Sequence, residues 1–276
     1  MPSVKSHDGT QLFCRRWGEG RPIVFVHGWA MSSESWQSAM LLAMRAGYQA
    51  IAYDRRGGGR SDDPGRGYDY DSLADDLAAV LEEFDVRDAI LVGHSMGCGE
   101  IARYLTRYGA GRVAKVVMAA PALPFQLKTA DNPEGRLERP ALTAMREQWV
   151  ESFADWLAPA VQNAFGDTVQ PQRAARTLQI MLQCSLQAAI ETNIANAETD
   201  LRADLAQITT ATLILHGDND ASCPLEATGR RVAALMPHAR LKVYPGATHA
   251  LVVTHAAKMV DDIVAFAAEE PAAMVA

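Results

Sequence analysis

Side chains able to carry out nucleophilic acyl transfer occur in the order serine, carboxylate, histidine along this chain. Ser95 is the centre of "GHSMG", which directly follows the apolar run "AILV". A serine hydroxyl is a weak nucleophile at neutral pH, so it needs a histidine base, and that base needs a carboxylate to orient it. His249, in "YPGATHAL", is the candidate base, and "HGDND" at residues 216–220 contains the candidate carboxylates. Such a set would attack the carbonyl carbon of an acyl compound.

The carboxylate has two candidates, Asp218 and Asp220. Asp218 follows Gly217 directly and is well placed to brace the turn through its own backbone. Asp220 lies further along the loop, from where it can reach a histidine on a neighbouring loop. We therefore expect Asp220 to orient His249, with Asp218 as the alternative.

The glycines around Ser95 fit a tight turn from a strand into a helix. A serine held in a strained conformation at such a turn presents its hydroxyl above the sheet, whereas a turn without this role would only need small residues. The N-terminus of the following helix directs N–H groups at the same point. We expect the Met96 N–H to be one oxyanion donor and the Trp29 N–H, from "VFVHGWAM", to be the second.

Two further reactive side chains lie next to the candidate nucleophile. His94 is predicted to pack behind the turn, because neighbouring residues of a strand point to opposite faces. Cys98 is interpreted as a small packing residue on the helix that follows. The histidines interpreted as surface or capping residues are His7, His238 and His255.

Short apolar runs alternate with amphipathic runs along most of the chain. The run at 71–84 places Leu73, Leu77 and Phe84 on one helical face. Strand–helix alternation indicates an α/β fold with a mostly parallel, doubly wound sheet, whose ligands bind beyond the carboxyl ends of the strands. Residues 6–17 are predicted to form an antiparallel strand leading into this sheet. The predicted strands of the alternation are 21–27, 48–54, 88–93, 113–120, 211–217 and 239–244.

The alternation stops between residues 121 and 208, a stretch of helix-like runs rich in Met and aromatic residues. The sheet pattern resumes at once with "ATLILHG", so an insertion is favoured over a separate helical domain. We therefore predict a core of residues 1–120 and 209–276 with a helical cap of residues 121–208. The aromatic and Met side chains of the cap would line an apolar pocket.

Composition excludes several other classes of protein. A chain of 276 residues that is 49% hydrophobic can bury a large core, and its formal charge of −7 argues against a nucleic-acid surface. The sequence has no apolar run near the roughly 20 residues of a membrane span and no secretion-signal pattern at its start. The four cysteines are far apart, which predicts neither a disulfide framework nor a zinc site and favours a cytoplasmic location.

These motifs resemble the α/β-hydrolase family, and within it the cofactor-free haloperoxidase and arylesterase branch. The resemblance covers nearly the whole chain, through "VFVHGW", "AYDRRGGGRSD", "LVGHSMGCGEIARYL", "AETDLRADL", "LILHGDNDASCPLE" and "LKVYPGATHALVVTHA". It implies a Ser95–Asp220–His249 triad, oxyanion donors at Trp29 and Met96, and hydrolysis of small esters through an acyl-enzyme. It implies no metal, haem or other cofactor, and relatives commonly self-associate as homo-oligomers. In this branch hydrogen peroxide can replace water and yield a peracid.

The sequence departs from the branch at three positions and leaves other activities open. Ala30 stands where members strong in peracid formation carry proline, Cys98 where glycine is usual, and Gly58 where His or Phe is common. A lactonase, an amidase or a carbon–carbon bond hydrolase would use the same triad. A non-catalytic ligand receptor on this fold could also retain all three residues. Dehalogenases and epoxide hydrolases are disfavoured, because they need an aspartate where this chain has Ser95.

Overall fold

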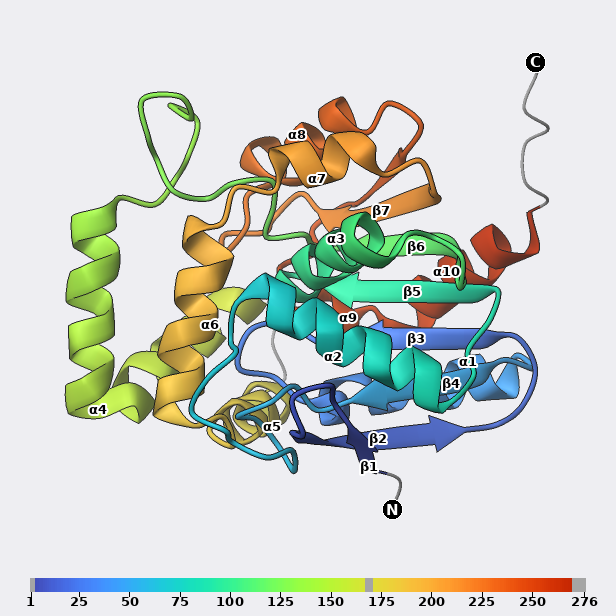
Figure 1. Ribbon diagram of the computed structural model, residues 1–276. Helices are drawn as coiled ribbons and strands as arrows, with labels where there is room; N and C mark the ends of the chain where they lie inside the picture. The colour runs from blue at the N-terminus through green and yellow to red at the C-terminus, as the bar shows by residue number, and fades with distance from the viewer. Residues whose placement is uncertain (1–2, 167–170, 270–276) are drawn as a thin grey trace.

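An eight-stranded sheet forms the centre of the computed structural model, which describes residues 3–166 and 171–269 (Figure 1). The strand order is β1-β2-β4-β3-β5-β6-β7-β8. β2 pairs antiparallel with β1 and β4, and the neighbours from β4 to β8 are all parallel, which confirms the predicted mostly parallel α/β sheet. The strands are β1 (Ser3–Lys5), β2 (Gln11–Trp17), β3 (Pro22–Val26), β4 (Gln49–Tyr53), β5 (Ala89–His94), β6 (Val113–Ala119), β7 (Ala211–Gly217) and β8 (Arg240–Tyr244).

Helices cover both faces of the sheet. One buried cluster joins the sheet to α2 and α3, and a second joins its opposite face to α1 and α10. The helices of these layers are α1 (Gln37–Arg45), α2 (Tyr70–Glu83), α3 (Met96–Tyr108), α7 (Arg202–Gln207), α8 (Gly229–Leu235), α9 (Leu251–Thr254) and α10 (Ala256–Ala268), with the 3-10 turns η1 (Ser33–Trp36) and η2 (Leu225–Ala227).

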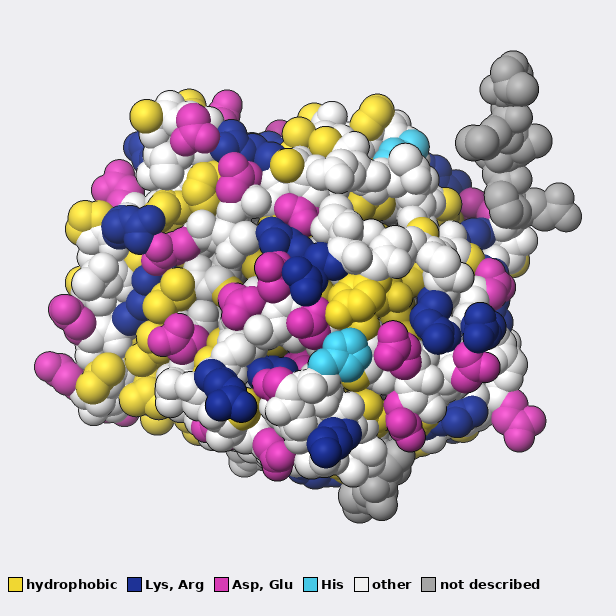
Figure 2. All heavy atoms as spheres, in the orientation of Figure 1, with side chains coloured by type: hydrophobic (Ala, Val, Ile, Leu, Met, Phe, Trp, Pro, Cys, Tyr) yellow, Lys and Arg dark blue, Asp and Glu magenta, His cyan; other side chains and the backbone are white. Residues whose placement is uncertain are grey.

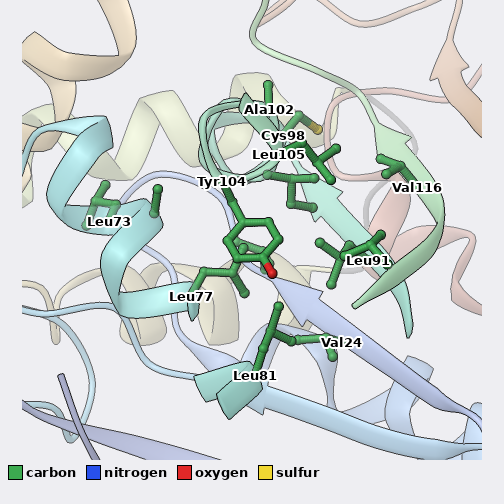
Figure 3. Close-up of a cluster of buried hydrophobic side chains, with 14 of the residues drawn as sticks. Val24, Leu73, Leu77, Leu81, Leu91, Cys98, Ala102, Tyr104, Leu105 and Val116 are labelled. Atoms are coloured by element: carbon green, nitrogen blue, oxygen red, sulfur yellow. The ribbon is translucent and has the colours of Figure 1, made fainter. Parts of the chain in front are cut away.

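The central strands are buried on both faces, as their continuous apolar sequence predicts. Every residue of β5 is buried, and successive side chains of β3 enter opposite layers, Val24 on the α2 side and Phe25 on the α1 side. Figure 3 shows Leu73 and Leu77 of α2 in the same cluster as Leu91 of β5. Burying each such leucine stabilises the fold by about 2 kcal/mol, so the sheet is a firm support for loops at its edge.

The helices α4 (Arg139–Phe165), α5 (Pro171–Met181) and α6 (Leu186–Glu198) come between β6 and β7 in sequence. Figure 1 shows them together at the side of the sheet towards which the arrows of β3 and β5 point. α4 bends at Ser152, whose backbone leaves the helical region at φ −157° and ψ 88°, and it contains Pro159. The boundaries 1–120, 121–208 and 209–276 of core and cap stay a prediction.

The surface of the described residues carries charges of both signs. Figure 2 shows Lys and Arg side chains interspersed with Asp and Glu across the viewed face, with no broad area of one sign there. Across the described part of the chain, no helix is long and apolar enough to cross a membrane.

Candidate active site

Ser95 occupies a sharp turn between the end of β5 and the start of α3. Its backbone has φ 53° and ψ −117°, a conformation that is strained for a residue with a side chain. The neighbouring glycines are required by close approach of the chain. A Cβ on Gly97 would lie 2.5 Å from the Val26 carbonyl oxygen, and one on Gly93 would lie 2.8 Å from the Cys98 nitrogen.

The structure brings Ser95, His249 and Asp220 into one hydrogen-bonded series. They follow β5, β8 and β7 respectively, so the parallel sheet delivers all three to the same edge. His249 Nε2 lies 3.0 Å from Ser95 Oγ, and His249 Nδ1 lies 2.8 Å from Asp220 Oδ2. The Asp220 side chain is fully buried and that of His249 is 14% exposed, so the imidazole separates the buried carboxylate from the accessible hydroxyl.

The surroundings of Asp220 keep its carboxylate ionised. Burial alone would raise the pKa of Asp220, but the electrostatic interaction with His249 and the hydrogen bonds of His216 and His249 hold it below its usual range. The Cys223 N–H also donates to Asp220 Oδ1 at 2.7 Å. An ionised Asp220 can accept from Nδ1 of His249, which leaves Nε2 as the base facing the serine.

The other candidate carboxylate, Asp218, contacts a different group. Asp218 Oδ1 accepts from the Gly246 N–H at 2.6 Å, so it braces the loop after β7 against the loop after β8. The structure thus places the two aspartates in the separate positions that the sequence suggested for them.

His94 differs from the expectation that it packs behind the turn. Its ring centroid lies 5.0 Å from that of His249, its Nε2 lies 3.1 Å from the His249 carbonyl oxygen, and it lines the cavity above Ser95. The expected placement on the opposite face was wrong because Ser95 leaves the strand at positive φ, so strand alternation does not relate the two side chains. The burial of His94 agrees with the packing role that was expected in place of a catalytic one. Burial, and then the neighbouring His249, lower the pKa of His94 to about 3, so this imidazole is neutral near pH 7.

Cys98 is buried, with its Sγ 3.9 Å from the Ala119 carbonyl oxygen. Burial raises the pKa of the Cys98 thiol well above its usual value, so the group stays protonated. Its position agrees with the expected packing role.

The loop after β3 passes close to the candidate nucleophile. A Cβ on Gly28 would lie 3.3 Å from the Ser95 Cβ, which places the adjacent Trp29 amide near the hydroxyl. Met96 is the first residue of α3, so its N–H is among those that a helix leaves without an internal acceptor. Gly28, Trp29 and Ser95 line the same cavity, and the oxyanion roles of the Trp29 and Met96 N–H groups stay a prediction.

Arg55 holds this loop, a role that sequence reasoning missed. Arg55 Nη2 donates to the His27 carbonyl oxygen at 2.8 Å, and Nη1 donates to that of Gly28 at 3.2 Å. The guanidinium also lies 2.8 Å from the buried carboxylate of Glu100 on α3. Arg55 lies in "DRRGGGRS", but the motif alone did not indicate which carbonyl groups it binds.

The Trp29 side chain connects the same loop to the helices α4 and α6. Its Nε1–H donates to the Ala189 carbonyl oxygen of α6 at 2.8 Å. Its ring lies 5.0 Å from Trp149 and 6.2 Å from Trp156, both on α4. The side chain is thus an anchor, and the backbone N–H of Trp29 is the group predicted to bind the oxyanion.

A cavity of about 370 Å³ opens above Ser95 and is mostly apolar. Helices α4 and α5 supply much of its wall, through Met145, Trp156, Leu157, Phe165 and Met181. Six polar side chains that sequence reasoning did not single out also line it, namely Gln126, Arg136, Thr177, Asn193, Asn196 and Ser222. Within residues 3–166 and 171–269, no group of three or more His, Cys, Asp or Glu side chains could hold a metal ion.

Comparison with known proteins gives consistent results. A family model described as "alpha/beta hydrolase fold" matches residues 21–256. A non-heme haloperoxidase from Rhodococcus erythropolis is 40% identical over 96% of this chain and 99% of its own length, and a bifunctional esterase/perhydrolase from Acinetobacter calcoaceticus is 33% identical over the same shares. The crystal structure of a bromoperoxidase from Bacillus anthracis superposes with a TM-score of 0.93 at 32% identity, covering 97% of this chain and 99% of that one.

Proposed function

Because the chain belongs to the α/β-hydrolase fold family, we propose that it is a serine hydrolase that cleaves small carboxylic esters. The observation that carries this proposal is the series from Ser95 Oγ to His249 Nε2 at 3.0 Å and from His249 Nδ1 to Asp220 at 2.8 Å. It opens onto an apolar cavity large enough for a small acyl compound.

His249 takes the proton of Ser95 as Oγ attacks the ester carbonyl carbon. The resulting oxyanion is bound by the N–H groups of Met96 and Trp29, each worth about 3 kcal/mol to the transition state. His249 then protonates the leaving alcohol, and Ser95 carries the acyl group as an ester. Water, deprotonated by His249, attacks this ester and releases the carboxylic acid. Asp220 fixes the His249 tautomer and stabilises its charged form throughout.

We assign the selection of substrate to residues 121–208, acting as a cap on the core of residues 1–120 and 209–276. Support comes from the position of α4 and α5 in the cavity wall and from the Trp29 anchor, which joins the cap to the loop of residues 27–29 after β3, called the oxyanion loop below. The substrate is a small molecule. A cytoplasmic location and assembly into a homo-oligomer stay predictions.

Turnover of p-nitrophenyl acetate by the wild type and by Ser95→Ala tests the proposal. We expect Ser95→Ala to lose at least about a thousandfold in kcat with an unchanged thermal unfolding curve, because the other groups cannot replace the nucleophile. Retained turnover in this variant would contradict the assignment of Ser95.

Perhydrolysis is the second candidate activity, favoured by the haloperoxidase and perhydrolase names of relatives at 33–40% identity. Hydrogen peroxide would attack the acyl-Ser95 ester in place of water, giving a peracid and the free serine. Ala30 adopts φ 54°, which proline cannot adopt, so this loop differs from one with proline at position 30. We therefore expect hydrolysis to exceed peracid formation, measured as bromination of monochlorodimedone in acetate and peroxide.

Lactones, amides and carbon–carbon bonds are alternative substrates of the same triad. A panel of aryl esters, lactones and anilides, run at equal enzyme concentration, separates them from esters. A non-catalytic receptor would turn over none of these compounds.

A further inference from the structure

Arg136 is the one Lys or Arg side chain among the described residues of the cavity wall. It lies in the loop between β6 and α4, drawn in green above α4 and α6 in Figure 1. Cleavage of a neutral ester by Ser95 does not require a cation at this place. The charge is therefore available to a group of the substrate other than its ester.

The guanidinium is held in place by buried partners. Arg136 Nη2 donates to Gln126 Oε1 at 2.5 Å, and Gln126 is only 3% exposed. Gln126 Nε2 in turn donates to the Asn196 carbonyl oxygen at 2.9 Å. The backbone beside Arg136 is also fixed, because the Leu137 N–H donates to the Gln126 carbonyl oxygen at 3.0 Å. A guanidinium restrained in this way loses little further freedom when it binds an anion.

Arg136 differs from the neighbouring arginines in having no carboxylate partner. No Asp or Glu oxygen in the described ranges 3–166 and 171–269 lies within 4.0 Å of it, and its single strong hydrogen bond leaves further N–H donors for a ligand. The neighbouring arginines that do pair with an Asp or Glu are Arg139, Arg146, Arg202 and Arg231.

Two amide side chains add neutral donors to the same cavity. Asn193 Oδ1 accepts from Arg146 at 2.9 Å, and Asn196 Oδ1 accepts from the Tyr70 hydroxyl at 3.1 Å. The side-chain oxygens of Asn193 and Asn196 are therefore already hydrogen-bonded, and their NH₂ groups remain available to donate to a ligand. One cation with neutral donors suits a group with a single negative charge and two acceptor oxygens. A carboxylate fits this description, whereas a phosphate dianion would need a second cation.

We propose that the natural substrates are esters that also carry a carboxylate, which Arg136 binds while Ser95 attacks the ester carbonyl. The inference rests on the proposed ester hydrolysis and narrows its substrate class. Arg136 Nη2 lies 3.8 Å from Cys223 Sγ, and Cys223 belongs to the loop that carries Asp220, so the anion site and the triad face one cavity. Because Arg136 is itself exposed, solvent screens the pair and limits its effect to about tenfold in kcat/KM.

The test compares two esters of equal acyl length, monomethyl adipate and methyl hexanoate. We expect the wild type to favour the adipate ester in kcat/KM by about tenfold, a preference that weakens in high salt. Arg136→Gln should abolish this preference, and Arg136→Lys, which keeps the charge but not the planar fork, should retain part of it. Monomethyl succinate and suberate then report the spacing between the carboxylate and the scissile bond.

Arg139→Gln is the matched control, because Arg139 is a nearby exposed arginine that pairs with Glu198 outside the cavity wall. Its ratio of the two kcat/KM values should equal that of the wild type. If methyl hexanoate is hydrolysed efficiently and Arg136→Gln leaves the ratio of the two kcat/KM values unchanged, the inference is overturned. The proposed ester hydrolysis would then still hold.

A protein that hydrolysed neither ester would contradict the proposed function, so binding supplies a separate readout. Calorimetric titration of Ser95→Ala with each ester should show tighter binding of monomethyl adipate, lost in Ser95→Ala/Arg136→Gln. If Ser95→Ala bound monomethyl adipate and methyl hexanoate with equal affinity, as Ser95→Ala/Arg136→Gln is expected to do, this result alone would overturn the inference.

Discussion

At the edge of the sheet, Ser95, His249 and Asp220 are joined by hydrogen bonds of 2.8 and 3.0 Å. Across the cavity, Trp29 meets Trp149 and Trp156 of α4 through rings whose centroids lie 5.0 and 6.2 Å apart. Proton transfer depends on donor and acceptor positions within a few tenths of an ångström, whereas apolar contacts of this kind accept many shapes. The difference agrees with the proposal that the edge performs the chemistry and that residues 121–208, the proposed cap, select the substrate.

The largest expected effect on kcat distinguishes Asp220 from Asp218. Asp220→Asn removes the charge that orients His249, and kcat for p-nitrophenyl acetate should fall by about 10⁴-fold. Asp218→Asn is the matched control, because Asp218 contacts Gly246 and not His249, and kcat should stay within about threefold. Equal losses in the two variants would contradict the assignment of Asp220.

A smaller effect should follow from loosening the oxyanion loop. Arg55→Lys keeps a charge opposite Glu100 but loses the fork that binds the His27 and Gly28 carbonyl groups. We expect kcat to fall by about 10- to 100-fold with KM nearly unchanged, because the loss concerns the transition state.

Arg56→Lys controls for the stability cost of losing a buried guanidinium. Arg56 pairs with Asp76 and Asp8 and donates to the Arg66 carbonyl oxygen, whereas Arg55 donates to those of His27 and Gly28. Its kcat per folded molecule should equal that of the wild type. A similar loss of kcat in both variants would show that Arg55 acts through general stability.

Acid should lower the free energy of unfolding of the protein through the buried His94 at the edge of the sheet. His94 is held neutral with a pKa of about 3, whereas an unfolded histidine takes up its proton near pH 6.5. Between these values the unfolded chain binds more protons, so the free energy of unfolding decreases as the pH falls from 6.5 towards 3, by about 2.5 kcal/mol between pH 7 and pH 4.5. Asp220, with its lowered pKa, adds a further loss only below about pH 4.

Urea unfolding of the wild type and of His94→Asn at pH 7 and pH 4.5 measures this effect. The midpoint of His94→Asn should depend less on pH than that of the wild type. Residues 121–208 contain no histidine, so they contribute nothing to this histidine-driven part of the pH dependence. Parallel pH curves for the two proteins would contradict the burial of a neutral His94.

The smallest expected effect lies in the cap. Trp156→Ala enlarges the cavity, and KM for p-nitrophenyl hexanoate should change by about three- to tenfold while kcat for the acetate ester changes less than threefold. Val150→Ala is the control, because Val150 is 65% exposed on the same helix, and both constants should stay unchanged. A large loss of kcat in Trp156→Ala would remove the distinction between chemistry at the edge and selection in the cap.

Sequence patterns predicted which residues lie together at the carboxyl edge of the sheet, because the position of each depends on local features. Continuous apolar strands, the glycines beside Ser95 and the loops that follow β7 and β8 are all visible in short stretches of sequence. The sheet then brings those loops together without further information. Helix α1 was not predicted, because residues 37–45 bury only Ala39, Met40 and Ala43 and show a weak apolar stripe.

The contacts that sequence reasoning missed depend on distant parts of the chain. Arg136 reaches the cavity because its loop is paired with residues 126–128, and His216 contacts Asp220 because the loop between them folds back. The bend of α4 at Ser152 has no local signal, since no proline or glycine stands at that position. Side-chain positions in the cap therefore required the structure.

Labelling with a fluorophosphonate, followed by peptide mass mapping, tests the central claim most directly. This reagent forms a covalent bond only with a serine that a neighbouring base activates. We expect one adduct per chain, on Ser95, and none in the His249→Ala variant at the same reagent concentration. Labelling of a different serine, or equal labelling of Ser95 with and without His249, would contradict the account.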